Sequence, residues 1–282
     1  MARLTNPFTW AAELIDKGFS VQDALRKVSG SVSTDFYFEV SKGNVAGHSS
    51  VNKFGANSDI ADGTEEPVWS GSGAYTFSTT ADITRIVSDS TSDNGKTVEV
   101  QGLDSNWDVV VQTKALGSPA TTGVALDTAL IRVFRMRFLD AATNVGTIQC
   151  GVGAVTTAFT AGNLRAQMDP GRAQTLMAIY TVPRGKTAYM SKYYCSIIGD
   201  PGPPARAPDY AIFRLYVADR ANGYTPQLKH AVGAAMVGTS LVEHEFIPAG
   251  PATEKSDIYI TAQPEGDIGS VSAGFDLIIV DN

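Results

Sequence analysis

The chain has 282 residues, which is enough for one large domain or two ordinary ones with a sizeable core. Its 22 basic and 29 acidic side chains give a net charge of −7, which argues against a protein that binds nucleic acid through a basic surface. Only two cysteines and three histidines are present, so a disulfide framework is excluded and acid–base or metal chemistry has few candidate residues. We therefore expect no catalytic, cofactor or metal site, and no enzymatic activity.

The sequence also lacks the patterns of membrane insertion and secretion. No apolar run approaches the roughly 18 residues that a membrane-spanning helix needs, and the opening MARLTNPFTW has no apolar signal-peptide core. We expect a protein that is kept in cytosol-like conditions and has no membrane among its partners.

Residues 1–30 carry the signals of two short helices. Asn6 before Pro7 fits an N-cap with proline in the first turn, and Ser20 with Asp23 has the form of a capping box that begins a second helix. A glycine ends each helix. The pattern predicts an N-terminal helical hairpin.

The apolar face of this hairpin needs a partner surface, because each helix is shorter than the roughly 12–15 residues at which isolated helices become marginally stable. The face either docks onto a neighbouring subunit or covers this chain's own sheet, and the sequence favours neither. The candidate assembly contacts are the apolar residues of the two helices: Phe8, Trp10, Leu14, Leu25 and Val28.

Residues 31–119 predict a small β region with extended loops. Runs of β-branched and aromatic residues place strands at Asp35–Val40, Ala74–Ser78, Ile83–Val87, Thr97–Leu103 and Val109–Thr113. Residues 41–73 read as a long polar arm, and Asp93-Asn94-Gly95 is typical of a tight turn. The linker composition of Gly117–Gly123 places a domain boundary after residue 119.

Residues 120–282 predict a β-sandwich domain. Its clearest strand is Leu130–Leu139, in which Phe134, Met136 and Phe138 face one side and Arg135 and Arg137 the other. Further strands are expected at Thr147–Val152, Thr175–Val182, Thr187–Ile198, Tyr210–Ala218, Gln227–Val232, Leu241–Ile247, Asp257–Ala262 and Val271–Val280.

The spacing of these strands decides the expected fold class. Turn residues recur at intervals of roughly ten to fifteen residues with no convincing helix between strands, which favours an antiparallel, jelly-roll-like sandwich over a parallel sheet. Four prolines make Gly199–Pro208 an exposed and rather stiff loop. The whole chain is therefore expected to be mainly β.

Two acidic segments are candidates for a metal site or a catalytic carboxylate pair. Asp89–Gly95 places oxygens at alternate positions, as calcium loops do, but Val100 stands where an EF-hand needs glutamate; a polar turn is favoured over a weak metal site. Asp104 and Asp108 bracket Trp107 and could form a carboxylate pair, although the surrounding residues are typical of a turn.

The histidines and cysteines give no recognised motif. Glu243-His244-Glu245 has Pro248 where a zincin helix needs histidine, and on a strand the two glutamates would face away from His244. His230 reads as another satisfied or surface histidine. Cys150 and Cys195 lie within apolar strands and are expected to be buried free thiols. No nucleophile elbow, dinucleotide fingerprint or P-loop occurs.

Several segments of the second half together resemble the structural proteins of tailed-bacteriophage virions, of the jelly-roll capsid decoration and tail type. The resemblance extends from Gln174 to Val280, and its centre is the stretch TVPRGKTAY, a strand that turns into another strand. The other segments are Leu228-Lys229-His230, Gly238-Thr239-Ser240 and Ser272–Val280.

This resemblance implies a non-enzymatic virion component, assembled in the host cytoplasm. The expected function is that of a capsid decoration, or cement, protein that stabilises subunit junctions. Its expected partners are further copies of itself in a homo-oligomer such as a trimer, and other virion proteins such as the major capsid protein, with no direct contact to nucleic acid.

Two other functions stay open. A tail or head spike component would bind a host receptor or glycan through the proline-rich loop and exposed tyrosines, of which the candidates are Tyr193, Tyr194, Tyr210 and Tyr224. A hydrolase on a sandwich scaffold would need a cleft that gathers His48, His230 or His244 with two carboxylates.

Overall fold

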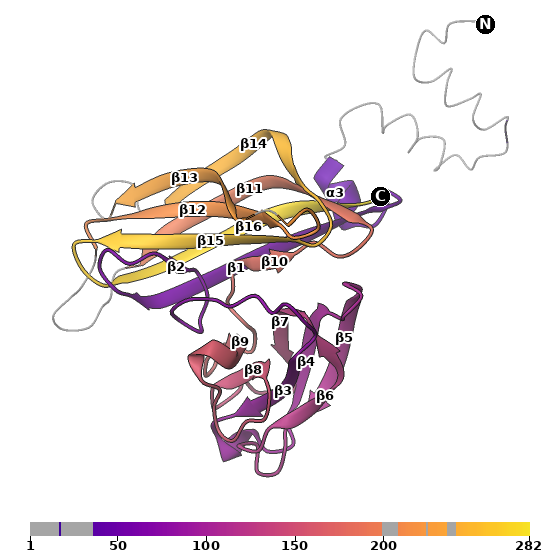
Figure 1. Ribbon diagram of the computed structural model, residues 1–282, viewed down its shortest axis with the longest axis vertical. Coiled ribbons are helices and arrows are strands. Elements are labelled where there is room, and N and C mark those ends of the chain that lie inside the picture. The colour runs from indigo at the N-terminus through magenta and orange to yellow at the C-terminus, as the bar shows by residue number, and fades with distance from the viewer. Residues whose placement is uncertain (1–16, 18–35, 199–207, 224, 236–240) are drawn as a thin grey trace, which may run out of the picture. The chain divides into compact units, whose positions relative to one another are not determined.

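The computed structural model describes residues 17, 36–198, 208–223, 225–235 and 241–282, and most of its elements are strands (Figure 1). The chain divides into two compact units, of which the first ends at Ser50 and the second is Val51–Asn282. The predicted helical hairpin, with Phe8, Trp10, Leu14, Leu25 and Val28, lies outside the described residues, as do residues 199–207 of the proline-rich loop. Among the described residues, no helix is long and apolar enough to cross a membrane.

The first described element is a helix where the sequence predicted a strand. Helix α3 spans Phe36–Ser41, so the strand predicted at Asp35–Val40 is wrong. The backbone N–H of Lys42 donates to the carbonyl of Phe38, which closes a helical turn, and the Lys42 ammonium pairs with Glu39 at 3.2 Å. Six residues rich in aromatics fit either periodicity, and here local hydrogen bonds decide for the helix.

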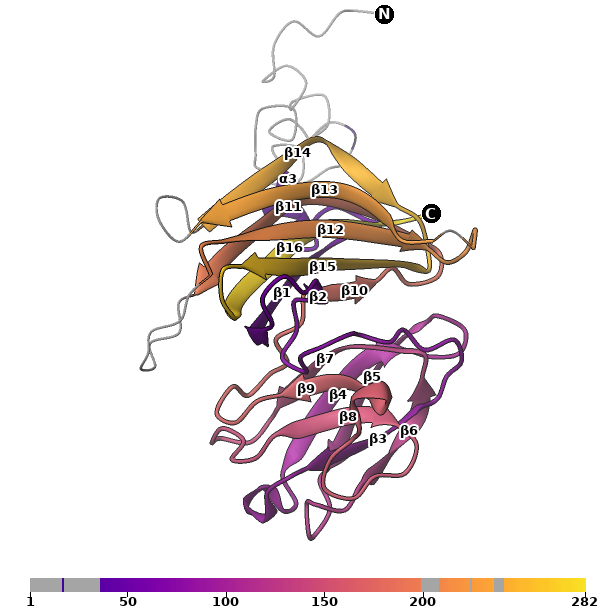
Figure 2. The same cartoon turned by 60° about the vertical axis from the view of Figure 1, so that its left-hand side comes forward.

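Two antiparallel sheets form a sandwich (Figures 1 and 2). The first has the order β1-β16-β11-β14, whose strands are His48–Ile60, Gly269–Asp281, Lys186–Ile198 and Leu241–Ala252. The second has the order β10-β15-β12-β13, with β2 also paired to β15; these strands are Ile179–Thr181, Ser256–Glu265, Tyr210–Asp219, Gln227–Ala235 and Glu66–Pro67. Strand β11 is antiparallel to both of its neighbours β16 and β14, as β12 is to β15 and β13.

One hydrophobic core fills the sandwich. Phe213 of β12 and Phe275 of β16, which belong to different sheets, are both completely buried in it. Burying a side chain of this size contributes about 1.5–3 kcal/mol to folding. The alternation of inward and outward residues along these strands therefore fixes how the two sheets face each other.

A second, smaller β region has its own core and two further sheets (magenta in Figure 1). One has the order β6-β3-β8-β9, with strands Val124–Leu130, Ile83–Ser88, Ile148–Val152 and Leu164–Met168. The other has the order β5-β4-β7, with strands Val109–Ala115, Thr97–Leu103 and Arg132–Phe138. The predicted boundary after residue 119 falls between β5 and β6, and strands from its two sides pair with each other.

The mainly β, antiparallel prediction is confirmed, and most of the expected strands occur at or near their predicted residues. Strand β4 has the predicted bounds, and β7 alternates as expected, with Met136 buried and Arg137 exposed. Besides Asp35–Val40, the strand predicted at Ala74–Ser78 does not form, and only Ile179–Thr181 of the predicted Thr175–Val182 is a strand.

Four observed strands were not predicted, namely β1, β2, β6 and β9. Strand β1 lies in the segment that reads as a polar arm, because Gly55 and Asn57 are typical of loops. At Gly55 a Cβ atom would lie 2.3 Å from the carbonyl oxygen of Val68, so glycine is required there by a close approach of two backbones.

Candidate functional site

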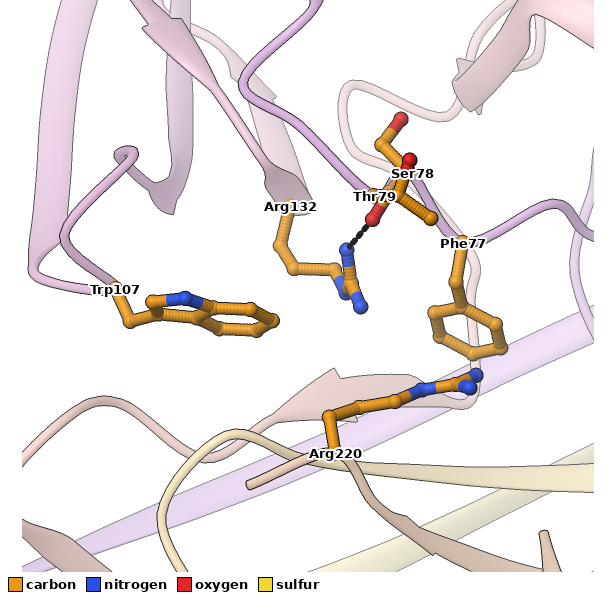
Figure 3. Close-up of a pocket in the computed structure, with 6 residues that line it drawn as sticks. All are labelled: Phe77, Ser78, Thr79, Trp107, Arg132 and Arg220. Atoms are coloured by element: carbon orange, nitrogen blue, oxygen red, sulfur yellow. Dashed lines mark hydrogen bonds between the residues drawn. The ribbon is translucent and has the colours of Figure 1, made fainter. Parts of the chain in front are cut away.

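A pocket of about 220 Å³ opens among side chains from four separate segments of Val51–Asn282. Its lining residues are Phe77, Ser78, Thr79, Trp107, Arg132 and Arg220 (Figure 3). Figure 3 shows the Trp107 ring on one side of the Arg132 guanidinium and Phe77 on the other. The Arg132 Cζ atom is 5.0 Å from the Trp107 ring centroid and 5.2 Å from that of Phe77, which are cation–π distances.

The two arginines of the pocket are held by one buried carboxylate. Asp257 of β15 has no exposed surface, and it accepts two hydrogen bonds from Arg132, Nε to Oδ1 at 2.8 Å and Nη2 to Oδ2 at 3.0 Å. Arg220, directly after β12, donates from Nε to Oδ2 at 2.8 Å, and the Thr181 hydroxyl donates to Oδ1 at 2.6 Å. A buried ion is tolerated only when paired and hydrogen-bonded, as Asp257 is.

This network also connects the two hydrophobic cores. Arg132 begins β7 in the smaller β region, whereas Asp257 and Thr181 face each other on paired strands of the sandwich. The remaining amino group of Arg132, Nη1, donates to the carbonyls of Ser78 and Ile131 at 2.6 and 2.8 Å. The guanidinium is therefore fixed from three directions.

Trp107 is presented by a tight turn between β4 and β5. Its backbone has φ of +67°, a left-handed conformation that is uncommon for a residue with a side chain. The Asp104 carboxylate stabilises this turn by accepting the N–H groups of Asn106 and Asp108 at 2.8 and 3.0 Å. The Asp108 carboxylate in turn accepts the guanidinium of Arg184 at 2.8 Å. Asp104 and Asp108 thus shape the turn that positions Trp107, as the turn interpretation predicted.

The other acidic segment is also built as a turn. Asp93 is buried, and its carboxylate accepts the Ser88 hydroxyl at 2.7 Å and the N–H groups of Val145 and Gly146, each at 2.9 Å. Gly95 takes φ of +66°, which glycine adopts without strain. The predicted turn at Asp93-Asn94-Gly95 is therefore confirmed.

The structure brings two of the three histidines together. The rings of His230 on β13 and His244 on β14 stack with centroids 3.9 Å apart, and the hydroxyl of Tyr193 lies 2.6 Å from His230 Nδ1. Burial, and secondarily the nearby His244, lower the pKa of His230. Glu243 and Glu245 are exposed on the opposite side of β14, as its alternation predicted. Within the described residues, no three His, Cys, Asp or Glu side chains gather as a metal site would require.

Other predicted residues are distributed differently. Of the four tyrosines considered for ligand contact, Tyr193 is buried and Tyr210 is 45% exposed. Cys150 and Cys195 are buried, as predicted, and burial raises the pKa of the Cys150 thiol to about 12. These thiols therefore stay protonated and unreactive at neutral pH.

One buried amine was not predicted from the sequence. Lys53 of β1 donates its Nζ to the carbonyl of Phe134, and the side chain is almost completely buried. Desolvation, and secondarily the positive charge of Arg135, lower the pKa of Lys53 to about 7. The Lys53 amine is therefore close to the midpoint of its titration at neutral pH.

The pocket itself could not be located from the sequence. Phe77, Trp107, Arg132 and Arg220 are far apart along the chain, and none belongs to a recognisable motif. The single signal was that Arg132 interrupts an otherwise apolar run, Ala129–Phe134, at a position that proves to be buried.

Comparison with known proteins assigns no family. No protein-family model matches the chain, and no curated protein matches it. The function is therefore argued from the residues and their geometry.

Replacing Asp257 with asparagine should destabilise the protein by about 3–5 kcal/mol, because Arg132 would keep a buried charge without its counterion. Urea unfolding followed by circular dichroism measures this. The control is Asp127→Asn, which removes an exposed partner of Lys114 and should cost less than about 1 kcal/mol. Equal effects of the two substitutions would contradict a central role for Asp257.

Replacing Lys53 with methionine should remove a pH dependence of stability. The folded-state pKa lies below the ordinary value of 10.5, so between about pH 7 and 10.5 unfolding takes up a proton and the free energy of unfolding of the native sequence rises with pH, by at most about 1.4 kcal/mol per unit. Urea titrations at pH 7.5 and 9.5 should show a larger rise in the native sequence than in the variant. An identical rise in both would show that Lys53 titrates normally.

Proposed function

We propose that this protein is a non-enzymatic structural component of a tailed-bacteriophage virion, a jelly-roll-like capsid decoration protein that stabilises subunit junctions. The sequence resemblance between Gln174 and Val280 supports this proposal, since it falls on the β-sandwich strands β10 to β16. The observation that carries it is the exposure of large apolar side chains on strands β13 and β14, the edges of the two sandwich sheets.

These exposed apolar residues are Leu228 of β13 and Leu241 and Ile247 of β14. Their exposed fractions are 52%, 54% and 88%, in strands whose inward residues are at least partly buried. Edge strands also present unpaired backbone N–H and C=O groups to a neighbouring chain. Side chains and backbone therefore both suit contact with another protein.

The charges on β14 limit how such contacts form. Glu243 and Glu245 point outward between the two apolar residues, and Glu243 pairs with Lys192 of β11 at 2.9 Å. Charged side chains on an edge strand discourage indiscriminate sheet growth. The edge is thus suited to a defined partner, which we take to be a further copy of this chain or the major capsid protein.

The stabilisation follows from burial of apolar surface. Stable protein interfaces bury about 1,600 Å² in total, and each large apolar side chain taken from water contributes about 1.5–3 kcal/mol. A decoration protein that spans two capsid subunits adds this free energy to their junction. The proposed location of this protein is accordingly the virion, which is assembled in the host cytoplasm.

Replacing both Leu241 and Ile247 with glutamate should weaken self-association or capsid binding at least tenfold, since about 1.4 kcal/mol corresponds to a factor of ten. Analytical ultracentrifugation and co-sedimentation with undecorated capsids measure the two equilibria. Val145→Glu is the matched control, because Val145 is 58% exposed but lies in a loop. If the double variant and the control behave alike in both assays, the edge strands are not the contact surface.

Removal of residues 1–30 should leave a folded β protein that no longer enters particles, because the apolar face of the predicted hairpin is then missing. Circular dichroism tests folding, and electron microscopy of intact particles locates the protein and its absence. Normal incorporation of the shortened chain would refute a docking role for this segment.

A second function is favoured by the aromatic and cationic pocket. A tail or head spike component that binds a host receptor or glycan would need such a recess, and Trp107, Phe77 and Arg220 supply one. Glycan arrays separate the two functions, since reproducible binding favours the spike and particle localisation at subunit junctions favours decoration.

A further inference from the structure

We propose that the pocket of Phe77, Trp107, Arg132 and Arg220 binds a single carboxylate-bearing sugar unit, such as a uronic or sialic acid residue of an acidic glycan. The inference concerns this pocket alone and narrows the second function above. Its test is independent of the proposed role of the edge strands β13 and β14 in assembly.

The first argument is the supply of hydrogen-bond donors. Arg132 uses its Nε and both amino groups on Asp257 and on two backbone carbonyls. Arg220 uses only Nε on Asp257; within the described part of the chain its two amino groups form no hydrogen bond, and the side chain is 36% exposed. The outer edge of this guanidinium is therefore available to a ligand.

The second argument is local charge. Arg165 donates from Nε to the Ser78 hydroxyl at 3.0 Å, so it stands directly behind the pocket wall as a third cation. Against Arg132, Arg165 and Arg220 the hydrogen-bonded network contains one carboxylate, Asp257. The neighbouring Asp219 carboxylate is engaged elsewhere, by Asn222 and Thr253. In a chain of net charge −7, this recess attracts an anion.

The third argument distinguishes among anions. A planar guanidinium with a free edge matches a carboxylate through two parallel hydrogen bonds. Of the two arginines that line the pocket, Arg220 is the one whose amino groups form no hydrogen bond within the described residues, so a single guanidinium fork faces the ligand. One such fork matches a singly charged carboxylate better than a doubly charged phosphate monoester.

The fourth argument is shape. The aromatic rings of Trp107 and Phe77, both half-buried, line the recess beside the guanidiniums of Arg132 and Arg220 (Figure 3). Their remaining apolar surface can contact the C–H groups of a pyranose ring. Its volume of about 220 Å³ is below the usual ~300–1,000 Å³ of drug-sized sites and fits one monosaccharide. The exposed Thr79 adds a hydroxyl at the rim for the sugar's polar groups.

The test is titration of the full chain with methyl glucuronide, methyl glucoside and inorganic phosphate, followed by calorimetry and tryptophan emission. We expect saturable binding of methyl glucuronide, with a dissociation constant on the order of 1 mM for a single sugar unit, and at least tenfold weaker binding of the other two. Equal binding of the glucoside would overturn the role of the carboxylate. Equal binding of phosphate, or no binding of the glucuronide, would overturn the proposal.

Variants locate the binding in the pocket. Arg220→Gln and Trp107→Ala should each weaken glucuronide binding at least tenfold, and Arg220→Lys should weaken it less than Arg220→Gln, because lysine keeps the charge but loses the fork. Arg137→Gln is the matched control. Arg137 is an exposed arginine of β7 that pairs with Glu99 of β4 and does not line the pocket. Unchanged affinity in folded Arg220→Gln and Trp107→Ala variants, or the same loss in Arg137→Gln, would place the binding elsewhere.

Discussion

The carboxylate of Asp257 is the centre on which the arrangement of this protein depends. Burying an ion costs several kcal/mol, and Asp257 offsets that cost with four hydrogen bonds from Arg132, Arg220 and Thr181. Because these donors come from β7, from the end of β12 and from β10, the pairing holds strands of both hydrophobic cores in register. A hydrophobic contact would tolerate small slips that this directional network does not.

The same network creates the pocket. Arg132 is immobilised between two aromatic rings. Arg220 donates only its Nε–H to Asp257, so its two amino groups remain available to a ligand. Trp107 reaches this place only because the Asp104 turn holds a left-handed backbone, a strained conformation of the kind found at functional sites. Stability and the proposed ligand recognition therefore share one set of side chains, whereas the proposed assembly surface lies on the separate edge strands β13 and β14.

Individual residues show where sequence patterns suffice and where they fail. The alternation around Met136 and Arg137 identified β7, since one face of a strand against a core imposes a period of two. The pattern at Asp35–Val40 failed because six residues cannot separate a strand from a helical turn. Strand β1 was missed because Gly55, which suggests a loop, is required by the backbone that passes beside it.

The sequence by itself determined the fold class, most strands, the turns at Asp93 and Asp104 and the burial of both cysteines, because each of these follows from neighbouring residues along the chain. Only the tertiary structure decided the partners of Asp257, the lowered pKa of Lys53 and the stacking of His230 on His244. These depend on strands distant in sequence meeting across two sheets. Pairing of this kind is set by the packing of the whole chain, and no local pattern encodes it.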